Sequence, residues 1–299
     1  MLKNFVPLYP ISVPTPFDVG PVNMYLITEP EPVLVDTGPG LADSLEVLKK
    51  LLGERGVPLE RLRKIVLTHA HQDHCGMAAP LAELSGAPIY ASPLEGEALR
   101  KDSRLGAFYL RMMEEAGLSP EMVARQREHI QAVRAIGGPV DDFRPIEELG
   151  ALRCGPSTFR VVPTPGHTPG SISLWDSEGR ILIAGDTVIK KITPNPFLAP
   201  QEGAANGRFR ALQNYLETLG RIRALQPALR KECTDLDIPG SRWGLFSMQD
   251  DHGCLRHFHN HLGSIWIAAS RWSMSEYRQL WLRGRNNCSI WSEHQRRDG

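Results

Sequence analysis

Residues 68–76 read Thr-His-Ala-His-Gln-Asp-His-Cys-Gly, so His69, His71, Asp73 and His74 fall within six residues. The apolar run 65–67 directly precedes them, which is typical of a strand that ends in a polar cluster. Imidazole and carboxylate groups together suit Zn²⁺ and, less selectively, iron or manganese. Histidines scattered singly would be solvated loop residues, but three of them with an aspartate at this spacing predict a metal site.

Two more donors are expected downstream, because the ligands of one loop rarely complete the coordination of a metal. His167 follows the short apolar strand at Val161 in a turn rich in proline and glycine, which fixes the backbone and aims the ring. Asp186 ends the continuous apolar run 181–184, and a buried carboxylate there is costly unless it meets a cation or strong donors. Each alone is compatible with an ordinary turn; beside the first cluster, both are predicted ligands.

In this order the blocks resemble the metallo-β-lactamase superfamily of metal-dependent hydrolases. The resemblance rests on the His-x-His-x-Asp-His block, the Pro-Gly-His-Thr block at His167, the Gly-Asp block at Asp186 and an upstream Asp-Thr-Gly at Asp36. It covers about residues 1–230, and its first block is highly specific. It implies an α/β fold, a four-layer αββα sandwich of two sheets packed face to face, with the metals at one edge.

The resemblance also implies two zinc ions, with a single metal or iron as alternatives. The ligands implied for the first metal are three histidines: His69, His71 and His167. Asp73 and His74 would hold the second metal, and Asp186 would bridge both.

The same resemblance makes Asp36 a partner of a metal-bound histidine, whose orientation its hydrogen bond would fix. A bound zinc lowers the pKa of its water to about 7, so hydroxide is available at neutral pH. That hydroxide would attack an electrophilic carbonyl while the second metal stabilises the developing charge. Asp73 could orient the nucleophile by a hydrogen bond, which makes it the predicted catalytic residue.

The chain departs from the family pattern after residue 230. Family members supply one ligand more than the six named above, a histidine in a turn after the next helix, but no histidine follows the predicted helix 206–225 until His252. Composition changes at the same point, since five of the six tryptophans follow residue 231 and 23 of the 24 prolines precede it. We therefore expect a domain at 1–230 and an atypical tail at 231–299, either a frame-shifted reading of the gene or a genuine divergent extension.

If the tail is genuine, His252 is the best substitute for the missing histidine ligand, because the glycine after it permits a tight turn. A second candidate is the alternating set His257, His259 and His261, which would share one face of a strand.

Bulk properties agree with a hydrolase of small molecules. The 299 residues are 41% hydrophobic and carry a formal charge of zero, so no basic surface for nucleic acid is expected. No apolar run resembles a secretory signal or reaches membrane-spanning length. Five scattered cysteines predict reduced thiols in the cytoplasm, and Cys75 is expected to be a packing residue rather than a ligand. The oligomeric state is not predicted.

Strands are expected to alternate with helices. The predicted strands are 5–13, 22–28, 33–36, 65–68, 88–91, 159–164, 171–175 and 181–184. The predicted helices are 41–52, 77–85 and 206–225, the last with an apolar stripe that includes Leu212 and Leu216. The long connection at about 93–148 is predicted as a helical insertion with an apolar stripe that includes Phe108 and Met112. That stripe is either the core of a helical pair or a lid over the metals.

The predicted substrate is a thioester, ester or lactone, as in hydroxyacylglutathione hydrolases and lactonases. Exported zinc β-lactamases usually carry another residue at the position of Asp186. Superfamily phosphodiesterases and nucleases stay open, although no basic module is visible, and His71 argues against the di-iron oxygen reductases, which tend to carry glutamate there. A single-iron sulfur dioxygenase also stays open, and so does an inactive remnant that lacks the missing histidine ligand.

Overall fold

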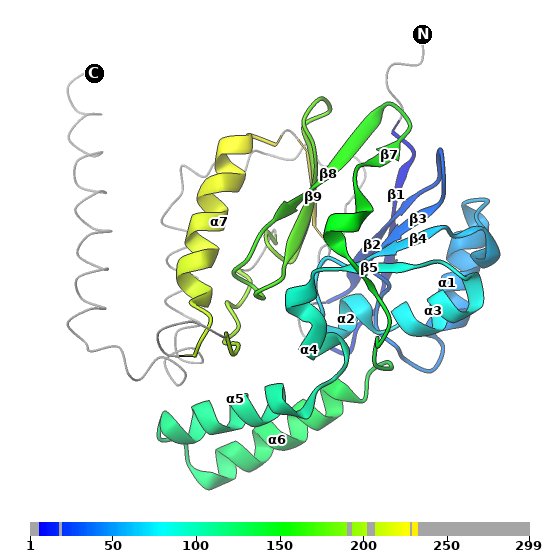
Figure 1. Ribbon diagram of the computed structural model, residues 1–299. Coiled ribbons are helices and arrows are strands. Elements are labelled where there is room, and N and C mark those ends of the chain that lie inside the picture. Colours follow the sequence, from blue (N-terminus) through cyan, green and yellow to red (C-terminus); the bar gives the residue numbers. More distant parts are fainter. Residues whose placement is uncertain (1–5, 18–19, 190–192, 202–206, 228, 233–299) are drawn as a thin grey trace, which may run out of the picture.

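The structure is a computed structural model that describes residues 6–17, 20–189, 193–201, 207–227 and 229–232. Two β-sheets face each other, and helices cover both outer sides (Figure 1). Helices α1 (Ser44–Glu54) and α3 (Ala78–Ser85) lie on the first sheet, and α7 (Ala211–Leu225) lies on the second. The predicted four-layer αββα sandwich is confirmed. No helix in the described ranges is long and apolar enough to cross a bilayer.

The first sheet joins six strands in chain order. They are β1 (Leu8–Val13), β2 (Val22–Ile27), β3 (Val33–Val35), β4 (Lys64–Val66), β5 (Ile89–Ala91) and β6 (Arg144–Pro145). The strands from β3 onward run parallel, so their carboxyl ends meet at one edge. Asp36 follows β3 there and Thr68 follows β4, and the helix α2 (Gln72–Cys75) and the 3-10 helix η1 (Leu59–Arg61) lie in the connections around β4.

The second sheet has the order β11-β10-β9-β8-β7. Its strands are β7 (Leu152–Cys154), β8 (Ser157–Pro163), β9 (Ile172–Asp176), β10 (Ile181–Gly185) and β11 (Leu229–Glu232). Because β9 is antiparallel to both β8 and β10, these two strands end at the same edge. The backbone N–H of Ile172 donates to the carbonyl of Thr68 at 3.0 Å, which joins this edge to the carboxyl ends of the first sheet.

Helix α7 turns a partly different face to the sheet than the apolar pattern predicts. Ile222, which belongs to the predicted stripe, is buried, but Leu212 and Leu216 are 41% and 55% exposed, and Tyr215 and Thr218 are buried in their place. The reason lies in the turn at Gly166, where a Cβ would come within 2.4 Å of the Cα of Tyr215. The Thr218 hydroxyl also donates to the carbonyl of the neighbouring Pro165 at 2.7 Å. A close backbone approach therefore decides the rotation of the helix.

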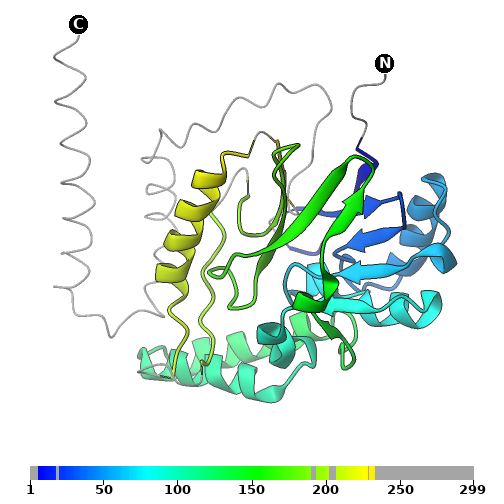
Figure 2. The same ribbon diagram turned by 45° about the horizontal axis from the view of Figure 1, so that its top comes forward.

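The insertion between β5 and β7 is helical, as predicted. It contains η2 (Pro93–Glu95), α4 (Gly96–Leu99), α5 (Ser103–Glu115), α6 (Pro120–Arg134) and η3 (Ile146–Leu149). Helices α5 and α6 form an antiparallel hairpin beyond the end of the sandwich that carries α2 (Figures 1 and 2).

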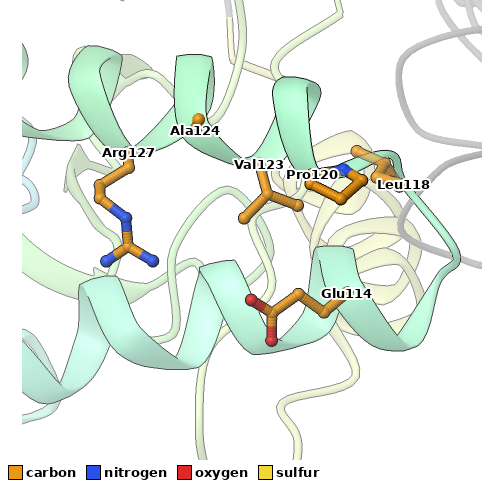
Figure 3. A pocket seen from close by; sticks show the side chains of 6 residues that line it. All are labelled: Glu114, Leu118, Pro120, Val123, Ala124 and Arg127. Carbon is orange, nitrogen blue, oxygen red and sulfur yellow. The ribbon is translucent and has the colours of Figure 1, made fainter.

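The apolar stripe of α5 is buried. Phe108 and Met112 are each 6% exposed, a burial that both alternatives, the core of a helical pair and a lid over the metals, would give, and Val123 on α6 is also buried. Near the connection between the helices, Val123 and the charged Glu114 and Arg127 line a hollow between α5 and α6 (Figure 3). None of the predicted metal ligands lines this hollow, so it is separate from the predicted site.

Three glycines meet where the insertion returns to the sandwich. Gly137, after α6, donates its N–H to the carbonyl of Gly40 at 3.3 Å. A Cβ on Gly137 would lie 2.3 Å from the carbonyl oxygen of Gly76, which follows α2. Gly137 also has a φ of +76°, a conformation that favours glycine. The end of the insertion is thus packed directly on the backbone of the histidine-rich loop.

This contact predicts unequal effects for two neighbouring substitutions. Gly137→Ala should lower the free energy of unfolding by about 2 kcal/mol or more, because it adds both backbone strain and overpacking. Gly138→Ala is the control, since a Cβ there has no neighbour within 4 Å, and it should change the free energy by less than about 0.5 kcal/mol. Urea unfolding measures both, and equal losses would contradict this account of the contact.

Candidate metal centre

All six predicted ligands and Asp36 come together where the two sheets meet. Asp36 follows β3, His69 follows β4, His167 lies between β8 and β9, and Asp186 follows β10. The other three residues are His71, Asp73 and His74. His71 directly precedes helix α2, and Asp73 and His74 lie within it. Of the seven side chains only that of His71 is half-buried; the others belong to residues at most 8% exposed.

Three imidazole nitrogens converge at one point of this cluster. Nδ1 of His71 lies 3.0 Å from Nε2 of His69 and 2.9 Å from Nε2 of His167. Around a four-coordinate zinc with Zn–N distances near 2.1 Å, ligand nitrogens are ~3.4 Å apart. The three rings are therefore gathered at nearly the spacing that a bound metal requires.

Hydrogen bonds behind the rings decide which nitrogen faces the centre. The Thr68 hydroxyl donates to Oδ2 of Asp36 at 2.8 Å, so it accepts from Nδ1–H of His69 at 3.1 Å. Nδ1–H of His167 donates to the carbonyl of Asn195 at 2.8 Å. Both rings therefore turn the lone pair of Nε2 inward, the form in which neutral imidazole binds metal.

His74 shows the same arrangement in a second group. Its Nδ1–H donates to Oδ2 of Asp36 at 2.9 Å, and its Nε2 lies 3.4 Å from Oδ1 of Asp186 and 3.6 Å from Oδ2 of Asp73. Within the described residues, Nε2 of His74 and Oδ1 of Asp186 are buried and have no hydrogen-bond partner. Two buried polar atoms without partners are costly, and a cation between them would satisfy both.

The charges around the cluster differ between the two groups. Burial and the neighbouring histidines lower the pKa values of His69 and His71 well below the usual range, and burial lowers the pKa of His167. Burial also opposes the charged form of His74, but the carboxylates of Asp186, Asp73 and Asp36 raise its pKa well above the usual value. The site is thus neutral at the three histidines and anionic around His74, as a cation site needs.

The donor atoms fit a metal in two groups. One is His69, His71 and His167, and the other is His69, His74 and Asp186; in each, all donor atoms lie within 4.8 Å of one another. Asp73 belongs to neither group, although it contacts His74 as the second-metal assignment requires. The residues present therefore fit a metal centre, and the assignment of each residue to one metal or the other remains a proposal.

Two residues near the centre were not found by sequence reasoning. The ring of Phe197 stands edge-on to the rings of His71 and His167, with centroid distances of 4.7 and 5.3 Å. Its backbone N–H donates to the carbonyl of His167 at 3.0 Å. The carboxylate of Glu95 accepts hydrogen bonds from both ligand loops. The Pro-Asn-Pro-Phe sequence at 194–197 is the one local signal, a stiff turn soon after Asp186.

The predicted substitutes for the missing histidine ligand lie outside the described residues. They are His252 and the set His257, His259 and His261. Because residues 233–299 are not described, the origin of the tail stays a prediction. The sheet itself continues past residue 230, because β11 runs to Glu232 and pairs in parallel with β10.

Comparison with known proteins agrees with the geometry. The model of the metallo-β-lactamase superfamily matches residues 17–230. The chain belongs to this superfamily. Together with the donor cluster, this membership makes the protein a metallo-hydrolase in its general class, in agreement with the predicted family and fold.

Relatives and solved structures support the same assignment. The chain is 27% identical to the probable metallo-hydrolase YqjP of Bacillus subtilis, over 73% of this chain and 68% of that protein. It is 28% identical to the human acyl-coenzyme A thioesterase MBLAC2, over 56% of this chain and 58% of the relative. The structure of the metallo-beta-lactamase family protein TTHA1429 from Thermus thermophilus aligns with a TM-score of 0.63 and 28% identity, covering 76% of this chain and 73% of that one.

The hydrogen bonds of Asp36 predict that Asp36→Asn weakens metal binding. Oδ1 of Asp36 accepts from the backbone N–H of Thr68, and Oδ2 accepts from the Thr68 hydroxyl and from Nδ1–H of His74. An amide accepts at one atom only, so asparagine would turn its NH₂ group toward donors on one of these two sides, and the orientation of His74 is lost. We expect a 10- to 100-fold loss of affinity for one metal equivalent, about the usual effect of such a partner. Zinc titration against a chromophoric chelator measures it, with the exposed Asp43→Asn as control. Unchanged affinity for both equivalents would show that Asp36 does not support a ligand.

Proposed function

We propose that this metallo-hydrolase cleaves a thioester, ester or lactone of a small molecule, with zinc as its metal. The observation that carries the proposal is the convergence of Nε2 of His69 and His167 with Nδ1 of His71, next to a second group that contains His74 and Asp186. We assign the first metal to the three histidines and the second to Asp73 and His74, with Asp186 shared by both.

The chain's own residues have separate tasks in this reaction. When bound, a divalent metal acidifies a coordinated water and polarises a carbonyl. His69, His167 and His74 are held in the correct tautomer by Thr68, Asn195 and Asp36, so they need no rearrangement to bind.

The carboxylate of Asp73 lies beside the second donor group, with Oδ2 at 3.6 Å from Nε2 of His74. We assign it a second task, to accept a hydrogen bond from the attacking water and hold its lone pair toward the carbonyl. Hydrolysis then places the new hydroxyl on the acyl carbon and releases the thiol or alcohol with the remaining proton.

Phe197 supports a substrate with an apolar part. Its half-buried ring covers the edges of His71 and His167, and it is the aromatic side chain that touches the three-histidine group among the described residues. An apolar acyl chain that packs on this ring would be removed from water, and its carbonyl would be brought toward the metals. The similarity to MBLAC2, an acyl-coenzyme A thioesterase, supports thioesters as the first class to test.

The cytoplasm is the proposed location. Cys75 and Cys154 are buried free thiols, which is the usual state in a reducing compartment. Burial raises the pKa of each thiol to about 12, so neither is a reactive thiolate at neutral pH. Cys75 thus behaves as the packing residue that its sequence position predicts.

The function is tested by metal analysis and hydrolysis on the same samples. Protein purified without chelators should contain close to two zinc per chain and hydrolyse acyl-thioesters, aryl esters or lactones. His167→Ala should lose metal and at least about 100-fold of the activity, while the exposed His129→Ala on α6 should keep both. Cleavage of only a phosphodiester or a β-lactam would contradict the proposal, and iron with oxygen uptake on a persulfide would instead establish a sulfur dioxygenase.

Phe197→Ala is expected to separate binding from chemistry. Loss of the apolar wall should raise KM for a long-chain thioester by about 10-fold, in the range for hydrophobic contacts in a pocket, with metal content and kcat nearly unchanged. A thioester with an acetyl group should show little change. Phe143→Ala is the control, because that ring instead packs under the guanidinium of Arg100, at 5.1 Å. Equal KM changes in both variants would contradict a role for Phe197 in substrate binding.

A further inference from the structure

Glu95 is a buried carboxylate outside the proposed reaction. It is the last residue of η2, at the start of the helical insertion, and is 3% exposed. Its Oε2 accepts a hydrogen bond from the backbone N–H of Ala70 at 3.0 Å, and its Oε1 accepts one from the backbone N–H of Gly170 at 2.7 Å. A charge at this depth is tolerated only because donors surround it.

Both contacts belong to loops that carry predicted ligands. Ala70 lies between His69 and His71, after β4 of the first sheet, and Gly170 ends the turn that carries His167, before β9 of the second. One side chain therefore ties together the two loops that supply the three-histidine group.

The carboxylate is enclosed as well as bonded. A Cβ on Gly170 would lie 2.7 Å from Oε1 of Glu95 and 2.8 Å from Oγ of Ser92. The Thr168 side chain also hydrogen-bonds to Glu95. The position of the carboxylate therefore leaves little freedom to the turn that follows His167.

We propose that Glu95 is a positioning residue that sets the separation of the two ligand loops and thereby the metal affinity of the three-histidine group. The proposal rests on the ligand assignment made above but is independent of the substrate. Nδ1 of His71 and Nε2 of His167 lie 2.9 Å apart on separate loops, and they keep that spacing only if the loops do not slide, since productive sites tolerate errors of only about 0.5 Å.

The chemistry of the two contacts makes glutamine a sharp test. Both partners are backbone N–H donors, so both terminal atoms of the side chain must be acceptors. In Glu95→Gln the amide NH₂ would face one of these donors, and one loop would be released while size and shape stay the same. Glu97→Gln is the matched control: it lies two residues further on, in α4, with a side chain 44% exposed and paired with the exposed Arg104.

The experiment measures zinc affinity by competition with a chromophoric chelator, and the visible spectrum of the cobalt-substituted protein. We expect Glu95→Gln to bind zinc 10- to 100-fold more weakly and to shift the cobalt bands, as loss of such a partner usually does. Glu97→Gln should match the parent protein. Neither readout needs turnover, so the result stands even if no thioester, ester or lactone is hydrolysed.

Glu95→Asp keeps the test decisive if the glutamine variant does not fold. The shorter side chain keeps the charge but cannot reach both loops, so zinc affinity should again fall while Glu97→Asp leaves it unchanged. A folded Glu95→Gln or Glu95→Asp protein with zinc affinity within two-fold of the parent and an unchanged cobalt spectrum would overturn the proposal. An equal loss in the Glu97 variants would overturn it too.

Discussion

The buried carboxylate of Asp36 is the interaction on which the rest of the centre depends. It accepts from the backbone and the hydroxyl of Thr68, both at 2.8 Å, and from Nδ1 of His74 at 2.9 Å. Through the first two bonds it joins the end of β3 to the end of β4, and through Thr68 and His74 it orients rings in both donor groups. With a φ of +60° at this position, the chain accepts backbone strain to aim the carboxylate.

Such a centre links metal binding to the stability of the fold. Nε2 of His74 and Oδ1 of Asp186 face each other at 3.4 Å, and folding of the sandwich removes both atoms from water. The charges of Asp186, Asp73 and Asp36 raise the pKa of His74 although burial opposes it. A divalent cation between the two atoms would compensate both, and its binding free energy would then become folding free energy at the edge where both sheets end.

Most of the fold and the donor set could be predicted from sequence because each donor follows an apolar strand within a few residues. Glu95 could not, since its partners are backbone N–H groups 25 and 75 residues away that any residue could supply. The buried face of α7 was predicted only in part for a similar reason: the apolar spacing marks Leu212 and Leu216 as core, but contact with Gly166 turns Tyr215 inward. Local pattern predicts elements and motifs, whereas close packing between distant segments decides how they face each other.

The insertion is attached to the metal loops at both ends. At its start Glu95 holds the loops of His69 and His167, and at its end Gly137 packs against Gly76. The base between them is cross-linked, because Lys101 donates to the carbonyl of Gly137 at 2.6 Å and Arg134 donates to that of Asp102 at 3.0 Å. A displacement of the base of the α5–α6 hairpin must therefore reach the ligand loops, so the insertion is a structural support of the metal centre.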